Sequence, residues 1–382
     1  MKTLKYFIIN AIETMLRMVP FPTKTGVIKI GNPDRNSPVL LTCNFHLTVE
    51  RVKRALQGMD CYLLVAKSKG INVWCAATGG LFTHHDVISV LKTSGIDELV
   101  DHRKVILPQL AATGIEGKIV RERSGWHVIW GPVYAKDIRA FIRNKFKKDV
   151  QMRVVRFPFV QRMEMAIAWA FPISVIAALI ILPFWRHLIL ALSALIWGMS
   201  FFIFLAIPLF ENRLRASGKR IGFIVFDFGR GGIQLALWGF FLLLIFGYAA
   251  AFHETDINFM LRWSFITLVI TLLLSMDLMG STPVFKSSLH EDRLLKISID
   301  HSKCKTAGFC ELVCPRNCYE INRHAHKTSI PRADDCVRCG ACIVQCPYDA
   351  LFFKNSDGEI LPPEKIRKYK LNLSGKHLVK VG

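Results

Sequence analysis

Eight of the eleven cysteines lie between Cys304 and Cys346, at the spacing of metal or cluster ligands. The last four form the run Cys336-x2-Cys339-x2-Cys342-x3-Cys346, followed at once by Pro347. Bacterial ferredoxins hold iron–sulfur clusters with this spacing: three cysteines bind one cluster and the fourth reaches the other. A zinc ribbon also uses paired cysteines, but it needs neither the tight spacing nor the proline. The run therefore predicts an electron-carrying iron–sulfur domain.

A second, less complete run precedes the first. It reads Cys304-x5-Cys310-x3-Cys314-Pro315, with Ala307 at the place of a second ligand, and alanine cannot bind iron. The two runs resemble the two-cluster ferredoxins, and among them the seven-iron type, which has an extra cysteine after the proline, here Cys318. The resemblance implies a [4Fe-4S] cluster on Cys314, Cys336, Cys339 and Cys342, and a [3Fe-4S] or labile [4Fe-4S] cluster on Cys304, Cys310 and Cys346. Cys318 is then a free cysteine near the second cluster, or a replacement ligand.

A different kind of cysteine occurs in the N-terminal half, in the stretch Asn72-Val73-Trp74-Cys75-Ala76-Ala77. Asn72 is a good helix N-cap, so Val73 is predicted to begin a helix and Cys75 to lie in its first turn. Unpaired backbone N–H groups there favour the thiolate, which binds a soft metal or attacks an electrophile. The small Ala76 and Ala77 would let a flat, bulky cofactor approach. The alternative is a cysteine that only packs, because free cysteines are often buried.

Residues 38–142 resemble the corrinoid-binding domain of the mercury-methylation corrinoid proteins, relatives of the corrinoid iron–sulfur protein of acetyl-CoA synthesis. Four blocks carry the resemblance: Asn72-Val-Trp-Cys-Ala-Ala77, Arg103-Lys-Val-Ile-Leu-Pro-Gln-Leu110, Arg123-Ser-Gly125, and Gly131-Pro-Val133 followed by Asp137-Ile138. The resemblance implies that residues 72–77 bind a cobalamin-type corrinoid and that Cys75 is the lower axial ligand of its cobalt. The chain departs from the family pattern at Thr78-Gly79: the family has a small residue followed by Lys or Arg at these two positions.

From Ser37 to Phe146 short apolar runs alternate with helical ones, which predicts a Rossmann-like α/β domain, expected over residues 21–160. Ligands of such sheets lie beyond the carboxyl ends of the strands. Thr42, Asn44 and Gln109 lie at the ends of predicted strands, so we expect them to make polar contacts with the corrin ring. The alternative for each is a turn residue that satisfies local backbone groups.

The chain is 52% hydrophobic, with a mean hydropathy of +0.32, which is too apolar for an ordinary soluble enzyme. Four apolar stretches, at 166–185, 188–210, 233–252 and 259–279, have the length of spanning helices and predict a four-helix transmembrane domain over 161–285. The ferredoxin domain, of the α+β class, and a tail would cover 286–382. The net charge of +21 would suit nucleic acid, but no nucleic-acid module is recognised, and basic residues beside an anionic leaflet explain the charge more simply.

The orientation in the membrane follows from the loop charges. The second loop contains Arg213, Arg215, Lys219 and Arg220, so the positive-inside rule predicts that it is cytoplasmic. Four spans would then place both non-membrane domains on the cytoplasmic side of the inner membrane. If the short apolar stretch Ile221–Phe228 also crossed, the C-terminus would lie outside. Residues 1–20 predict an amphipathic helix, lying on the membrane or on the domain.

These features together predict a membrane-anchored corrinoid methyl carrier. Corrinoid cobalt accepts a methyl group as Co(I), which needs a low-potential electron donor, and a fused ferredoxin would supply those electrons. The resemblance implies a corrinoid-dependent methyltransferase that takes the methyl group from a donor protein or from a methylated folate or pterin, and electrons from an external donor. Hg(II) is the acceptor in that family, but the tail after Cys346 lacks the extra cysteines thought to deliver Hg(II), which favours a paralogue with another acceptor. The alternatives are a membrane iron–sulfur electron-transfer protein that binds quinone, and an inactive corrinoid-domain sensor.

Overall fold

The computed structural model describes residues 2–210, 228–252, 256–275, 295–355, 358–370 and 379–380. The chain divides into two compact units. The helical unit comprises Met1–Val19 and Arg156–His290, and the α/β–ferredoxin unit comprises Pro20–Val155 and Glu291–Gly382. The predicted corrinoid-binding and ferredoxin domains are therefore parts of one unit, although the helical segment separates them in the sequence.

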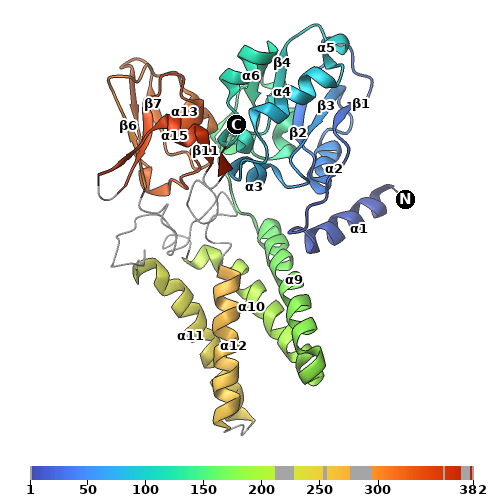
Figure 1. Cartoon of the computed structure of the whole chain (residues 1–382), viewed down its shortest axis with the longest axis vertical. Coiled ribbons are helices and arrows are strands. Elements are labelled where there is room, and N and C mark those ends of the chain that lie inside the picture. Colours follow the sequence, from blue (N-terminus) through green and yellow to red (C-terminus); the bar gives the residue numbers. More distant parts are fainter. Residues whose placement is uncertain are drawn as a thin grey trace. The chain divides into compact units, whose positions relative to one another are not determined.

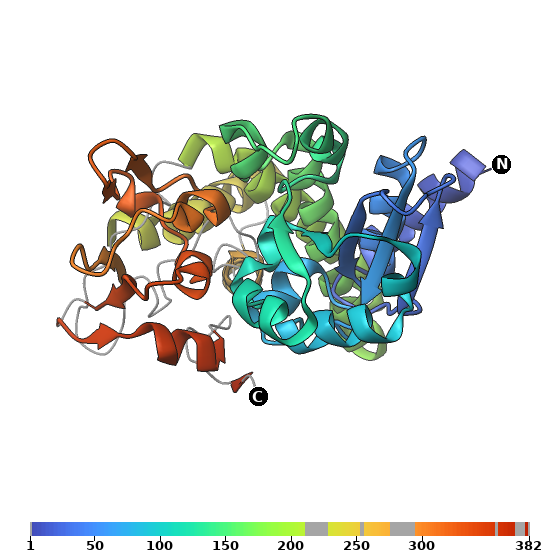
Figure 2. The same ribbon diagram turned by 90° about the horizontal axis from the view of Figure 1, so that it is seen from above.

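The α/β domain, residues 20–155, is built on a five-stranded sheet of order β1-β3-β2-β4-β5, coloured blue to green in Figures 1 and 2. Four strands are parallel, namely β2 (Val39–Cys43), β3 (Cys61–Ala66), β4 (Lys104–Leu107) and β5 (His127–Trp130). The edge strand β1 (Gly26–Ile30) pairs antiparallel with β3. The prediction of an α/β domain with a mostly parallel sheet is confirmed.

The central strands are buried on both faces, as expected for a parallel sheet covered by helices. Leu41 and Leu64 belong to one hydrophobic core, and their neighbours Leu40 and Leu63 belong to a second core on the other face. The first core includes side chains of α3 (Val73–Thr78), α4 (His84–Thr93), α5 (Ile96–Leu99) and α6 (Gly117–Ser124), together with the 3₁₀ helix η1 (Gln109–Thr113). The second includes side chains of α2 (His46–Ala55), η2 (Ala135–Asp137), α7 (Ile138–Arg143) and α8 (Val150–Arg153). The longer helices thus cover the two faces of the sheet, and its carboxyl edge is occupied by loops and by the short helices α3 and η1.

The ferredoxin domain contains a three-stranded antiparallel sheet of order β10-β9-β6 and a separate hairpin, β7–β8. Its strands are β6 (Lys296–Ile299), β7 (Glu320–Asn322), β8 (Lys327–Ser329), β9 (Leu351–Lys354) and β10 (Ile360–Leu361). Its helices are α13 (Phe309–Val313), η7 (Ala333–Asp335), α14 (Ala341–Gln345) and α15 (Pro363–Lys368), and a short pair, β11 (Tyr369–Lys370) with β12 (Val379–Lys380), follows. The short helices α13 and α14 each contain one cysteine and end just before another, so they position these thiols.

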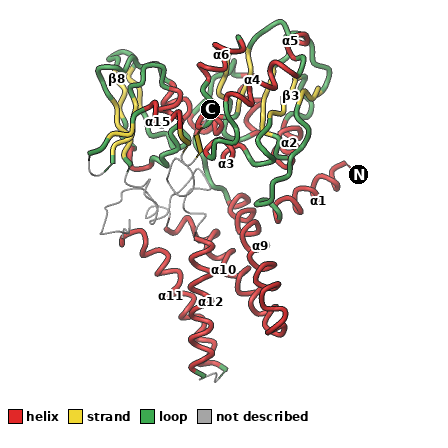
Figure 3. Tube along the Cα trace, in the orientation of Figure 1, coloured by secondary structure: helices red, strands yellow, loops and turns green. Residues whose placement is uncertain are grey.

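The helical unit contains α1 (Lys2–Met15), α9 (Phe159–Trp185), η3 (Arg186–Leu188), α10 (Ile189–Phe210), α11 (Phe228–Ala251) and α12 (Ile257–Ser275), drawn as red tubes in Figure 3. Helices α9 and α10 pack antiparallel: the Ser200 hydroxyl donates to the Ala166 carbonyl at 2.8 Å, and Arg162 donates to Leu205 at 3.0 Å. Helices α11 and α12 pack together, with a hydrogen bond of 3.1 Å from the Trp238 indole to Ser264.

Three segments of the described residues are long and apolar enough to cross a membrane: Phe159–Leu209, Gln234–Ala251 and Ile257–Leu274. The first has 51 residues, which would measure about 75 Å as one straight helix, against the roughly 30 Å of a bilayer core. The segment Phe159–Leu209 is not one straight helix, because it contains the two antiparallel helices α9 and α10. The basic loop with Arg213, Arg215, Lys219 and Arg220, residues 221–227 and residues 276–279 lie outside the described residues, so the orientation and the four-span arrangement stay predictions.

The predicted N-terminal helix is α1, and it belongs to the helical unit. Arg17, just beyond it, forms an ion pair of 3.3 Å with Glu164 of α9. Leu4, Phe7, Ile8 and Ile12 are each at least half exposed. Helix α1 thus packs on α9 within the helical unit, and not with the α/β domain, which was one of its two predicted positions. The other position, on the membrane surface, stays a prediction.

Candidate functional site

Cys75 lies where the sequence predicts it, in the first turn of a helix. Asn72 is the N-cap of α3, and its side-chain oxygen accepts a hydrogen bond of 3.0 Å from the Cys75 backbone N–H. Val73 is the first helical residue. The predicted cap is confirmed, and it fixes the orientation of the turn that carries the thiol.

The α/β domain contains three cysteines, and their burial separates them. Cys43 and Cys61 are both 0% exposed, whereas Cys75 is partly exposed. Burial raises the pKa of Cys43, and burial together with nearby Asp60 raises the pKa of Cys61 to about 11, so both stay neutral thiols. Cys75 is thus the thiol of this domain that a cofactor can reach.

The rest of the stretch 72–77 divides between the two sides of α3. Asn72 and Val73 are partly exposed, like Cys75, while Trp74, Ala76 and Ala77 are buried. A flat cofactor would therefore meet the Asn72, Val73 and Cys75 side of the helix. Contact with the three buried residues, which the resemblance also implies, stays a prediction.

The predicted polar contacts Thr42, Asn44 and Gln109 are all buried at the carboxyl edge of the sheet. Asn44 Oδ1 accepts hydrogen bonds from the backbone N–H groups of Ser68, at 2.8 Å, and Gly70, at 3.0 Å. It therefore shapes the loop that leads into α3. Gln109 is only 1% exposed, and its amide donates to the Arg153 carbonyl at 2.8 Å. Asn44 and Gln109 thus satisfy backbone groups of other segments of the chain, and corrin contact by any of the three stays a prediction.

Gly114 is a residue of this edge that sequence reasoning missed. It ends η1, and a Cβ atom built on it would lie 2.7 Å from the Ala77 carbonyl oxygen of α3. Any side chain here would push α3 away from η1. The close approach of the two segments explains the glycine, and no local sequence pattern marks it.

The two cysteine runs of the ferredoxin domain have matching backbones. Gly308 and Gly340 precede α13 and α14 with φ of 85° and 76°, and Thr306 and Arg338 have φ of 50° and 53°. Both helices end at a cysteine with φ of −72°, Cys314 in one half and Cys346 in the other. This correspondence puts Ala307 in the position that Cys339 has in the other half.

Cys314, Cys336 and Cys342 lie in one hydrophobic cluster of the ferredoxin domain. The pKa of the Cys342 thiol is raised mainly by burial and further by the nearby Cys336 and Cys339. The four cysteines are therefore neighbours. Cys318 lies with them: its backbone N–H donates to Cys314 Sγ at 3.3 Å, and its thiol contacts Cys314 and Cys336. The prediction that Cys318 lies near Cys304, Cys310 and Cys346 was wrong. Because Cys314 lies with Cys336 and Cys342, Cys318, four positions later, lies beside them too.

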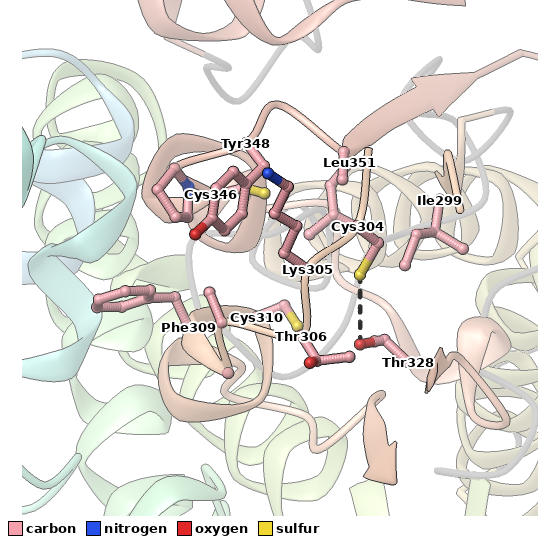
Figure 4. Close-up of a pocket in the computed structure, with 14 residues that line it drawn as sticks. Ile299, Cys304, Lys305, Thr306, Phe309, Cys310, Thr328, Cys346, Tyr348 and Leu351 are labelled. Atoms are coloured by element: carbon pink, nitrogen blue, oxygen red, sulfur yellow. Dashed lines mark hydrogen bonds between the residues drawn. The ribbon is translucent and has the colours of Figure 1, made fainter. Parts of the chain in front are cut away.

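Cys304, Cys310 and Cys346 line one small cavity of about 20 Å³ together with Ala307 and Thr328, and Figure 4 shows the three sulfurs around the same space. The Thr328 hydroxyl lies 3.5 Å from Cys304 Sγ. Three thiols with a methyl group at the fourth position fit a cluster that lacks one protein ligand. Among the described residues no three His, Cys, Asp or Glu side chains are grouped to hold a single ion.

The ferredoxin domain and the α/β domain meet at a seam, which we define by Gln345, Lys148 and Arg153 and their partners. Gln345 of α14 donates to the carbonyls of Ala112 and Ile115. Lys148 Nζ lies within hydrogen-bond distance of three oxygens, Gln109 Oε1 at 2.7 Å and the carbonyls of Gly131 and Leu312 at 3.0 Å.

Other contacts extend this seam. Arg153 donates to the Glu311 carbonyl at 2.9 Å, and Val155 N–H donates to Pro315 at 2.9 Å. Burial, and then repulsion from Arg153, lowers the pKa of Lys148 well below its usual value. The seam is thus a hydrogen-bonded contact, and it was not predicted from the sequence.

Comparison with known proteins supports both halves of this unit. Residues 11–142 match the family model described as CO dehydrogenase/acetyl-CoA synthase delta subunit, and residues 297–356 match the 4Fe-4S dicluster domain. The chain carries a corrinoid iron–sulfur protein family domain and a 4Fe-4S ferredoxin domain. The prediction of a corrinoid-family domain fused to a ferredoxin is confirmed at this level.

Three relatives illustrate the match. The acetyl-CoA decarbonylase/synthase complex subunit gamma of Methanopyrus kandleri is 35% identical over 128 residues, 33% of this chain and 27% of that protein. Subunit gamma 2 of Methanosarcina thermophila is 39% identical over 118 residues, 30% and 25% of the two chains. The corrinoid/iron-sulfur protein large subunit of Moorella thermoacetica is 33% identical over 127 residues, 33% and 28%. The chain spans about a quarter of the length of these relatives, so their activities come to it only as proposals.

Proposed function

We propose that the chain is a membrane-anchored corrinoid methyl carrier, a corrinoid-dependent methyltransferase whose ferredoxin domain reduces cobalt to Co(I). The observation that carries this proposal is Cys75: it is the partly exposed thiol of the α/β domain, capped by Asn72, in a domain matched to the corrinoid iron–sulfur family. A bound corrinoid would supply methyl transfer, and iron–sulfur clusters would supply single electrons.

The residues of the chain hold and orient these groups. The Cys75 thiolate would bind cobalt, and it lies in the first turn of α3, where the helix dipole favours negative charge. Asn72 fixes the start of that turn, and Asn44 fixes the loop before it. Cys314, Cys336, Cys339 and Cys342 would hold a [4Fe-4S] cluster, and Cys304, Cys310 and Cys346 a [3Fe-4S] or labile [4Fe-4S] cluster.

The helical unit would anchor the carrier in the membrane by four spans. Because residues 20–155 and 291–382 form one unit, both must lie on the same side of a membrane, and the segment between them must cross an even number of times. Two antiparallel pairs, α9 with α10 and α11 with α12, satisfy this requirement, whereas three crossings do not. Cytoplasmic placement, at the inner membrane, agrees with the basic loop at 213–220.

The methyl donor would be a protein or a methylated folate or pterin, and the electron donor a low-potential carrier. The acceptor is Hg(II) if the chain works as the mercury-methylation proteins do. Thr78-Gly79 departs from the pattern of that family, so a paralogue with another acceptor is the second form of the proposal.

The test is a visible spectrum of the purified full-length protein after anaerobic incubation with a corrinoid. Wild type should retain corrinoid absorbance beside that of the iron–sulfur clusters. Cys75→Ala should keep the clusters and lose or shift the corrinoid bands, because alanine suits a helix but cannot bind cobalt. Cys61→Ala is the matched control, since it also removes one thiol, but from the buried second core. Wild type that retains no corrinoid would leave the iron–sulfur electron-transfer protein as the better account.

A further inference from the structure

The ferredoxin domain meets the α/β domain at the carboxyl edge of the sheet, where the Cys75 helix α3 also lies. Helix α14 packs on η1, and η1 packs on α3. Cys339 packs against the core of the α/β domain, and Val313 and Ala341 are buried members of that core. One layer of chain, η1 with Gly114, therefore lies between a ligand of the first cluster and the helix that carries Cys75.

The second set of cysteines has different surroundings. The cavity lined by Cys304, Cys310 and Cys346 is bordered by ferredoxin residues alone, as the close-up shows (Figure 4). Cys346 does face α6 and β5, but across a cavity of about 400 Å³ that Lys118, His127 and Trp130 also line. Buried core residues join the first set of cysteines to the α/β domain. At the second set, Arg367 crosses this cavity: it donates to the Cys346 carbonyl at 3.1 Å and pairs with Glu116 at 3.7 Å.

Gln345 fixes the packed contact. It is the third residue after Cys342, is 9% exposed, and uses every polar atom of its side chain. Nε2 donates to Ala112 at 2.8 Å and to Ile115 at 2.6 Å, and Oε1 accepts from the Gly117 N–H at 3.3 Å. Gly114 lies between those two carbonyls, against Ala77 of α3. A shift of the Gln345 side chain would therefore move η1 relative to the first cluster.

We propose that the cluster on Cys314, Cys336, Cys339 and Cys342 is the exit site for electrons to the corrinoid, and that Gln345 is the residue that positions it against η1. The inference rests on the proposed function and adds a direction to it. The step moves one electron: [4Fe-4S]⁺ becomes [4Fe-4S]²⁺, and Co(II) becomes Co(I), with no bond made or broken. A low-potential one-electron carrier protein then re-reduces the ferredoxin domain, through the second cluster.

The test uses electron paramagnetic resonance on corrinoid-loaded full-length protein, because the two clusters can be made paramagnetic separately. The [4Fe-4S] cluster carries an unpaired spin when reduced, and a [3Fe-4S] cluster when oxidised. The magnetic coupling of Co(II) should be stronger to the reduced [4Fe-4S] cluster. Stronger coupling to the [3Fe-4S] cluster would overturn the proposal while leaving the methyl-carrier function intact. Absence of any bound Co(II) would instead overturn the proposed function and the inference with it.

Gln345→Met tests the positioning role, since methionine has a similar length but makes none of the three hydrogen bonds. We expect weaker coupling between Co(II) and the [4Fe-4S] cluster, with the reduction potentials of both clusters unchanged. In the corrinoid-free protein, backbone amides of residues 112–117 should exchange roughly tenfold faster, the loss expected for one or two buried hydrogen bonds. The control Asn355→Ala removes contacts with Glu359 in a ferredoxin turn and should change neither readout. Unchanged coupling and exchange in Gln345→Met would refute the role of Gln345.

Discussion

The side-chain amide of Gln345 donates to two backbone oxygens, those of Ala112 and Ile115, at 2.8 and 2.6 Å. These partners are more than two hundred positions away in the sequence and belong to another domain. The contact joins the ferredoxin helix α14 to η1, which packs on the helix of Cys75. It makes the electron-carrying and corrinoid-family parts of the chain one unit.

Lys148 should make stability depend on pH. Its folded-state pKa is lowered, so between that value and its usual pKa the unfolded chain binds more protons, and stability should rise with pH. Thermal unfolding midpoints of detergent-solubilised wild type, compared with Lys148→Met at pH 7 to 10, should show the wild type gaining relative to the variant as pH rises. The exposed Lys92→Met serves as the control and should run parallel to wild type. Parallel curves for Lys148→Met would show that the seam does not keep this amine from charging.

Gly114→Ala should disturb the Cys75 helix without touching Cys75. The new methyl group would meet the Ala77 carbonyl at 2.7 Å, and overpacking of this kind costs about 1–3 kcal/mol. The melting midpoint should fall, and alkylation of Cys75 by a thiol reagent should speed up as α3 loosens. Gly198→Ala is the control, because a Cβ there meets nothing within 4 Å. An unchanged midpoint and alkylation rate would mean that η1 and α3 move apart freely.

The cluster on Cys304, Cys310 and Cys346 should be the fragile one. Air-oxidised protein should show a [3Fe-4S] resonance signal, and Ala307→Cys should abolish it by supplying the missing ligand. Cys318→Ala should leave that signal unchanged, because Cys318 lies beside Cys314 and Cys336, but it should alter the potential of the [4Fe-4S] cluster by removing a thiol next to its sulfur ligands. Loss of the [3Fe-4S] signal in Cys318→Ala would mean that Cys318 belongs to the cluster of Cys304, Cys310 and Cys346.

The two non-membrane domains should lie on the same, cytoplasmic side of the membrane. Reporter proteins fused before Met1 and after Gly382 should both report the cytoplasm, because four crossings return the chain to its starting side. A cytoplasmic reporter at one end and a periplasmic reporter at the other would mean an odd number of crossings, with 221–228 the first segment to examine. That result would also contradict the seam between the domains.

The features that could be predicted from the sequence are those whose cause is local. Asn72 caps α3 because the acceptor and its N–H group are three residues apart, and the alternation of apolar runs sufficed for the α/β sheet. Gln345, Lys148 and Gly114 were missed because their partners come from distant segments. Cys318 was misplaced although one signal was available: it is four positions after Cys314, which the resemblance assigns to the set with Cys336, Cys339 and Cys342.

The central claim is that Cys75 binds cobalt. The most direct measurement is the resonance spectrum of Co(II) in Cys75→His loaded with cobinamide, a corrinoid without a nitrogenous base of its own. If residue 75 lies under the cobalt, the variant should show nitrogen superhyperfine splitting that wild type and Cys61→Ala lack. Bound Co(II) with the same unsplit spectrum in all three proteins would contradict the account, and Cys75 would be a packing residue.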